Sequence, residues 1–480
     1  MNKSITENPV DHSVLKKSVL FVAAFSAFIT PFMGAATNLA LPAIGRDLDA
    51  SAIQLNWVVT AYLLSTAVFI LPAGRLGDIV GRKKIFMYGL ILFSITTFAL
   101  VFSMHITYFL IMRALQGISS AMIFGTSMAI ITSVFPPGER GKAMGINITA
   151  VYAGLSSGPF LGGLLTEHLG WRSIFAVLVP VGLAAAILTH RKIKMEWADA
   201  SDEKLDIAGS LLAGTGLVTL ILGFSRLPGT LGTSMCGAGI ILLVLFIMQE
   251  KRAKHPLLDL SLIMNNRVFS FSSLAALIHY SATSAIGFFL SLYLQFLKGL
   301  DARTAGLILM TQPVVMAIFS VPAGKLSDRV NPGYLASAGI AITSVGLFLL
   351  TFIEADTSMA YIIGILVLNG TGYALFSTPN SNAIMSSVEK KHLGVASGML
   401  GTVRMIGQTM SLGVAMILIA LYIGDQKINP DNYPELLKTI KTGLVIFAFV
   451  CIPAIFASLA RNSKLNENYR NNNKGGPGKG

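Results

Sequence analysis

Ionisable side chains inside long apolar segments are the first candidates for chemistry in this sequence. Arg113 and Arg404 each lie within such a segment, and each is followed about one helical turn later by a glutamine, Gln116 and Gln408. A guanidinium in an apolar environment is costly unless it faces a cavity or a partner, so we expect sites that bind an anionic group or polarise a nearby acid. Snorkelling of Arg113 to the interface, and bonding of Arg404 to backbone carbonyls, are the simpler alternatives.

His279 is the one residue in the middle of an apolar segment that titrates near neutral pH in its ordinary state. It is therefore a candidate proton carrier, although a lone buried histidine is more often a neutral, hydrogen-bonded one. Asn38 lies in another apolar segment and can add an amide to the same polar cavity, or bond between helices.

The stretch GRLGDIVGRKK at 74–84 combines turn residues with charges. Its glycines allow a short turn with the flanking helices close together. Asp78 can accept hydrogen bonds from a helix N-terminus or pair with Arg82, four residues on. A plain positive-inside loop is the simpler alternative, but the Gly-Asp-Gly-Arg spacing goes beyond what such a loop needs.

A second glycine pattern, G-x8-G-xxx-G-P-xx-G-G, begins at Gly145. Glycines four residues apart fall on one helical face and let another helix approach closely, and a proline in the series bends or loosens the helix. We expect a tightly packed helix here, formed by Gly145, Gly154, Gly158, Pro159, Gly162 and Gly163, and generic close packing of a glycine-rich span is the simpler alternative.

The elements that must position these residues are membrane-spanning helices. Of the 480 residues, 53% are hydrophobic and 12% are charged, about half the charged fraction of soluble proteins. This composition excludes an ordinary soluble enzyme, a disordered chain and a disulfide scaffold, and the two cysteines lie in apolar runs. Runs long enough to cross a bilayer are predicted at 18–42, 53–73, 85–103, 107–134, 145–166, 171–190, 207–225, 231–249, 268–296, 304–323, 334–353, 358–385, 394–423 and 442–460.

The charge pattern predicts the orientation in the membrane. Fourteen spans place both termini on one side, and Lys and Arg are concentrated in the loops of that side. Positive loops stay in the cytoplasm, so we expect a multi-pass protein of the cell (inner or plasma) membrane with both termini cytoplasmic. The net charge of +13 then reflects the basic cytoplasmic loops and does not indicate a nucleic-acid partner. No carboxylate falls in the middle of a predicted span.

The sequence also repeats. PAGRLGD at 72–78 returns as PAGKLSD at 322–328, which makes Asp328 the counterpart of Asp78. Two copies of a six-helix unit with two helices inserted between them, 6+2+6, explain this offset, and such repeats are typical of secondary transporters. The predicted parts are a cytoplasmic segment 1–17, a first half 18–190, a linker with two inserted helices 191–264, a second half 265–461 and a disordered basic tail 462–480.

At these motifs the sequence resembles the major facilitator superfamily. The stretch 74–84 is similar to that superfamily's loop 2–3 signature, GKLSDRVNPG at 324–333 is similar to its degenerate copy, and the pattern from Gly145 resembles the antiporter motif of drug:proton exchangers. The fourteen-span layout, WVVTAYLLSTA at 57–67, WRSIF at 171–175 and HPLLDLSLI at 255–263 resemble the fourteen-span drug:proton antiporter family. The resemblance implies an all-α major-facilitator fold, associates Arg113 with proton coupling and makes the helix that begins at Gly145 a tight, gating interface. It also implies a conformational latch that governs switching, formed by Gly74, Gly77, Asp78, Gly81, Arg82 and Asp328.

One position departs from that family. Many members carry an acid five residues before the asparagine of N-x-A-L-P, and Met33 stands here. The proton carrier is then left open between His279, an acid at a span end such as Asp49, and the substrate itself.

We expect a proton-coupled exporter of drug-like or toxic amphipathic molecules that works by alternating access. The alternative is an exporter of an anionic or zwitterionic metabolite that Arg113 and Arg404 bind. An alternative of another class is a membrane sensor or assembly protein that does not transport. The expected partners are a small-molecule substrate, protons and the bilayer, with the chain functional as a monomer. No cofactor, metal site, nucleic-acid partner or enzymatic motif is expected.

Overall fold

The computed structural model describes residues 12–224, 226–227, 229–424 and 430–461. All regular secondary structure in these ranges is helical, and fourteen of the helical segments are long and apolar enough to cross a membrane. This confirms the fourteen predicted spans. The predicted tail 462–480 and most of the segment 1–17 lie outside the described residues.

The first six spans are single helices joined by short connections. The shortest connection is Gly81, whose φ of 128° ends one helix and begins the next, a backbone conformation that favours glycine. Ser51 and Gln54 form a capping box that starts the second helix. The helices are α1 (His12–Asp47), α2 (Ala52–Val80), α3 (Arg82–Val101), α4 (Ile106–Val134), α5 (Arg140–Leu169) and α6 (Arg172–Lys192).

The rest of the chain contains two inserted spans and six further ones. The inserted helices are α7 (Ile207–Phe224) and α8 (Thr230–Arg252). They are followed by the short α9 (Leu260–Asn265), by α10 (Arg267–Thr283), α11 (Ile286–Leu292) and the π-helical turn Tyr293–Leu297, and by α12 (Ala302–Leu309), α13 (Thr311–Ser327), α14 (Pro332–Leu350), α15 (Met359–Ser386), α16 (Leu393–Tyr422) and α17 (Tyr433–Ala460).

Two predicted spans are interrupted, which the apolar runs did not indicate. The ninth is broken between α10 and α11 at Ser284 and Ala285, and the tenth is broken between α12 and α13 at Met310. Pro313 accounts for the second break, because proline has no N–H to bond the carbonyl four residues earlier. Pro31, by contrast, lies inside the continuous α1.

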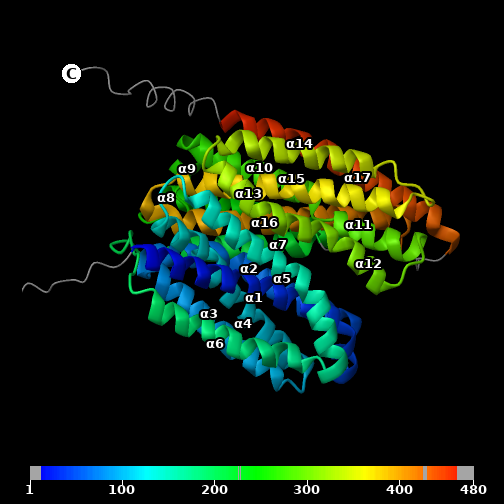
Figure 1. Cartoon of the computed structure of the whole chain (residues 1–480), viewed down its shortest axis with the longest axis horizontal. Coiled ribbons are helices and arrows are strands. Elements are labelled where there is room, and N and C mark those ends of the chain that lie inside the picture. Colours follow the sequence, from blue (N-terminus) through cyan, green and yellow to red (C-terminus); the bar gives the residue numbers. More distant parts are fainter. Residues whose placement is uncertain (1–11, 225, 228, 425–429, 462–480) are drawn as a thin grey trace, which may run out of the picture.

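The two six-helix groups lie on opposite sides of the molecule (Figure 1). In the first group α1 packs on α5, α2 on α4, and α3 on both α4 and α6. In the second, α10 packs on α16 and α17, and α15 packs on α13 and α14. The groups meet through α5 against α13 and α2 against α16, which the sequence repeat relates to each other. The beginning of α1 and the end of α17 lie toward the same end in Figure 1.

The inserted helices pack on each other, and α7 also contacts α2 and α16. They therefore lie against one of the two seams between the six-helix groups. The exact boundaries of the five predicted parts stay a prediction.

Candidate functional site

Asp78 joins the two six-helix groups at the end of α2. Its carboxylate accepts hydrogen bonds from the backbone N–H groups of Gly394 at 2.8 Å and Val395 at 3.1 Å, in the first turn of α16. It also accepts two bonds from the guanidinium of Arg82, at 2.7 and 2.9 Å. Both side chains are fully buried. The carboxylate therefore has both partners expected from the sequence, and it caps a helix of the opposite group; we call this contact the Asp78 cap.

Asp328 makes the matching contact at the other seam. Its two oxygens accept bonds from the N–H groups of Gly141 at 2.7 Å and Lys142 at 2.9 Å, in the first turn of α5. We call this contact the Asp328 cap. The two caps differ in their side-chain partners, because Pro332 stands where the repeat would place the counterpart of Arg82. Asp328 thus has helix N–H groups as partners but no arginine four residues on.

Glycines allow the helices to touch beside both caps. A Cβ on Gly74 would collide with the carbonyl oxygen of Gly394, and one on Gly324 with that of Gly141. The chains are in backbone contact at these points, so both seams are closed at the end where the caps lie.

The glycine-rich helix α5 serves two interfaces. A Cβ on Gly145 would lie 2.6 Å from the carbonyl oxygen of Ser320 in α13, across the seam. Further along, Gly158 and Gly162 face Ala35 and Ala36 of α1, within the same group, and Gly154 likewise faces α1. Pro159 lies inside the continuous helix. The predicted close packing is present, but the seam receives only the first part of the pattern.

Acids of the linker before α7 bind the loop between α2 and α3, a contact that the sequence analysis missed. Arg82 donates to Asp199 at 2.8 Å and its backbone N–H donates to the carbonyl of Trp197. Glu196 accepts from the backbone N–H groups at the start of α3, and Glu203 pairs with the buried Arg75. The available signal was the presence of five acids between residues 196 and 206, in a chain with few charges and with a basic segment at 82–84.

Arg113 is buried inside the first group, between α2, α3 and α4. Its Nε donates to the carbonyl of Val58 at 3.1 Å, its Nη1 donates to Gln116 at 2.5 Å, and its guanidinium lies 4.4 Å from the centre of the Tyr62 ring. Gln116 in turn donates to Thr97. With 1% of its surface exposed, Arg113 is held by this polar cluster and does not lie on the seam between the groups.

His279 is enclosed by the second group. Its ring packs on Phe376 at 4.2 Å and Tyr373 at 4.8 Å between centroids, and its Nδ1 is 3.9 Å from the sulfur of Cys451. Its Nε2 has no hydrogen-bond partner among the described residues, and its side chain is fully buried. This environment is that of a packed, neutral ring.

Arg404 lies in a different setting, between the groups. It is half-buried, 5.9 Å from the ring of Tyr280, and close enough to interact electrostatically with Tyr152 and Tyr373. Tyr152 belongs to α5 of the first group, while the other three belong to α10, α15 and α16 of the second. Within the described part of the chain the guanidinium has no ion pair. We call these four residues the Tyr-Arg cluster.

The Tyr-Arg cluster lies at mid-depth in the helices. Tyr152 and Arg404 are both about twelve residues from the capped ends of α5 and α16, which is roughly 18 Å at the helical rise. That distance is near the middle of a bilayer core of about 30 Å. The three tyrosines come from three helices in both groups, so no local pattern in the sequence indicated them.

The other candidates fall outside this cluster or at its edge. Gln408 is half-buried one turn beyond Arg404, Asn38 is exposed, and Met33 is fully buried. The buried carboxylates among the described residues are those of Asp78 and Glu250, both near helix ends.

Comparisons with known proteins agree with this architecture. The family model described as Major Facilitator Superfamily matches residues 23–412. The riboflavin transporter RibZ of Clostridioides difficile is 30% identical over 397 residues, covering 83% of this chain and 86% of its own length. The multidrug resistance protein Stp of Mycobacterium tuberculosis is 31% identical over 394 residues, covering 80% and 72%.

Two further comparisons extend over almost the whole chain. The cephamycin export protein CmcT of Amycolatopsis lactamdurans is 30% identical over 463 residues, covering 93% of each chain. The crystal structure of the human organic anion transporter MFSD10 (TETRAN) matches with a TM-score of 0.64 at 13% identity, covering 94% of this chain and all of that one. At this identity the structural likeness concerns the fold alone.

Proposed function

The chain belongs to the Major Facilitator Superfamily and is a multi-pass secondary transporter, and on that premise we propose that it is a proton-coupled exporter of amphipathic, drug-like small molecules. The two halves exchange access to a central site by opening one end of the seams while closing the other. The cell membrane, with both termini in the cytoplasm, is the proposed location.

The paired caps carry the proposal of alternating access. Asp78 and Asp328 each bind the N-terminus of a helix in the opposite half, and they lie at equivalent positions of the repeat. Contacts of this kind break without unfolding either half, because each half keeps its own helix packing. Two such caps at one end make that end a gate, and the positive loops favour the cytoplasmic side for it.

Export of drug-like molecules is favoured by the names of the relatives. Stp is a multidrug resistance protein, CmcT exports cephamycin, and the puromycin resistance protein pur8 of Streptomyces alboniger is 29% identical over 412 residues. RibZ transports riboflavin, so the relatives do not share one substrate.

The Tyr-Arg cluster favours a second candidate, an exporter of anionic or zwitterionic aromatic compounds. Arg404 has no carboxylate partner in the described residues, lies 5.9 Å from the centre of the Tyr280 ring and is within electrostatic reach of Tyr152 and Tyr373. A guanidinium at mid-depth attracts an anion strongly, and the rings offer faces for an aromatic ligand. A lipophilic cation would find no described carboxylate near this depth to offset the loss of its hydration.

Purified protein in liposomes with an imposed pH gradient tests both candidates. Internal pH is followed while tetraphenylphosphonium and then naphthalene-1-sulfonate are added, against protein-free liposomes. Proton movement with the cation supports the drug exporter, whereas movement with the sulfonate alone, lost in Arg404→Gln, supports the anion exporter. Substrate flux without any proton movement would refute proton coupling, and silence with every compound of both classes would favour a non-transporting role.

A further inference from the structure

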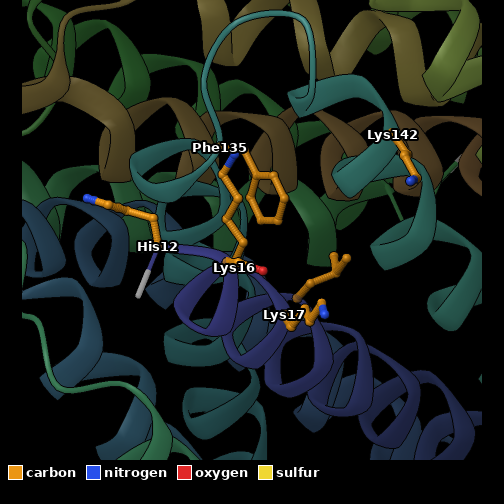
Figure 2. Close-up of a pocket in the computed structure, with 7 residues that line it drawn as sticks. His12, Lys16, Lys17, Phe135 and Lys142 are labelled. Carbon is orange, nitrogen blue, oxygen red and sulfur yellow. The ribbon is translucent and has the colours of Figure 1, made fainter. Parts of the chain in front are cut away.

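A basic pocket of about 390 Å³ lies at the capped end of the molecule, between the beginnings of α1 and α5 (Figure 2). Its basic lining comes from two helices: His12, Lys16 and Lys17 belong to the first turns of α1, and Lys142 belongs to the first turn of α5. Leu20 and Phe135 supply apolar lining. None of the residues that line it is an acid.

The positive charges of the pocket are only partly compensated. Lys16 pairs with Glu139 at 2.6 Å and lies 5.8 Å from the centre of the Phe135 ring. The ammonium groups of Lys17 and Lys142 have no ion pair among the residues that the structure describes. Like charges gathered around one hollow repel each other, so an anion bound there would lower the energy of the site.

An apolar stripe leads from this pocket along the membrane face of α1. Lys17, Phe21 and Phe25 are spaced four residues apart and so share one face of the helix. The Phe21 side chain is 58% exposed, and its ring stacks on that of Phe25 at 5.8 Å. The stripe starts where the predicted apolar span at 18–42 starts, which is where a bilayer would place its headgroups.

We propose that this pocket binds the phosphate of an anionic phospholipid, with Lys17 and Lys142 as the principal ligands and an acyl chain lying along Phe21 and Phe25. Basic clusters at the cytoplasmic ends of spans attract anionic headgroups. A membrane lipid is favoured over a soluble phosphate because the apolar stripe continues directly from the cationic lining. The site is separate from the Tyr-Arg cluster and does not depend on the transported compound.

Its position connects the pocket to the second seam. The backbone N–H of Lys142 donates to Asp328 at 2.9 Å, so a headgroup on the Lys142 side chain touches the helix end that the Asp328 cap holds. The lipid thereby binds beside the proposed gate.

Native mass spectrometry of the full-length protein in detergent tests the proposal. The protein is titrated with dioleoylphosphatidylglycerol or dioleoylphosphatidylcholine, and the bound lipid is counted. The variant Lys17→Gln with Lys142→Gln is compared with Lys251→Gln and Lys254→Gln, which removes two exposed cations near the same end of the molecule. We expect the first variant to bind phosphatidylglycerol about 25-fold more weakly, and the control variant to match the wild type.

Equal phosphatidylglycerol binding by the two double variants would overturn the proposal, as would equal affinity of the wild type for the two lipids. A third arm of the experiment distinguishes the phosphate of a lipid from a soluble phosphate. We expect Phe21→Ser to weaken phosphatidylglycerol binding and millimolar inorganic phosphate to leave the bound lipid in place. Displacement by inorganic phosphate with no effect of Phe21→Ser would show a soluble-anion site and refute the lipid assignment.

Discussion

Replacing Asp78 with asparagine tests the gate directly. The carboxylate receives four hydrogen bonds, two from Arg82 in its own half and two from Gly394 and Val395 at the start of α16. Only the last two cross the seam. The asparagine side chain would keep one oxygen and present an amide N–H₂ to the other donors. The variant therefore loses the negative charge at the helix N-terminus and at least one of the bonds across the seam.

The expected size follows from those losses. A hydrogen bond to a charged acceptor contributes about 1.5–3 kcal/mol, and the interaction of a carboxylate with a helix N-terminus adds up to about 2 kcal/mol when buried. Water partly replaces both in the open conformation. We expect the closed form to lose about 2–3 kcal/mol relative to the open form, which changes their ratio about 30- to 150-fold.

Distances between spin labels on the two halves measure this change. Labels are placed at Lys192, at the end of α6, and at Val330, after α13, both exposed. Cys236 and Cys451 are first replaced by alanine to leave two reactive sites. Double electron–electron resonance then reports the fraction of molecules with the gate open, and Asp78→Asn should raise that fraction.

Asp47→Asn is the matched control. Asp47 also pairs with an arginine, Arg172, at 2.5 Å, but this pair lies at the opposite helix ends and both side chains are partly exposed, at 45% and 37%. Such pairs contribute about 0–1 kcal/mol, so no shift is expected. If Asp78→Asn leaves the distance distribution of the wild type unchanged in a folded protein, the Asp78 cap does not hold the gate and the reasoning is wrong.

Three further outcomes are expected. Gly145→Ala should favour the open gate by about 1–3 kcal/mol, because the new Cβ would lie 2.6 Å from the Ser320 carbonyl oxygen. The same pair of spin labels measures the shift, and an unchanged distance distribution would contradict tight packing of α5 on α13. His279→Phe should keep the transport that a pH gradient drives. It should also keep or raise the thermal unfolding temperature, since it removes a buried ring nitrogen without a described partner. Loss of transport in the folded protein would instead favour a proton-relay role for His279. Glu203→Gln should lower the unfolding temperature, because it leaves the buried Arg75 without its carboxylate, and no change would show that the pair is energetically neutral.

The caps illustrate how far the repeat predicts the site. The spacing from Asp78 to Arg82 predicts an ion pair one helical turn apart, and the offset of 250 predicts that Asp328 is the counterpart of Asp78. The sequence does not specify which helix end each carboxylate meets. That choice depends on how α2 packs on α16 and α13 on α5, which are contacts between residues hundreds of positions apart.

The two intramembrane arginines show the same division. Their residue type and place in apolar runs predict a polar environment for both. Arg113 is enclosed by Val58, Gln116 and Tyr62 of its own half, whereas Arg404 lies beside Tyr280 of its own half and within electrostatic reach of Tyr152 across the seam. The difference arises from the orientation of each helix face within the bundle.

The sequence by itself determined the properties that act along the chain. Span number follows from the length of apolar runs, the expected orientation from the basic loops, and the paired acids from the internal repeat. Tertiary structure decided everything that needs distant segments to meet: the caps' helix partners, the linker acids on Arg75 and Arg82, the Tyr-Arg cluster and the basic pocket. The physical reason is that bilayer insertion depends on local composition, whereas close packing of glycine faces and pairing of buried charges depend on which helices become neighbours.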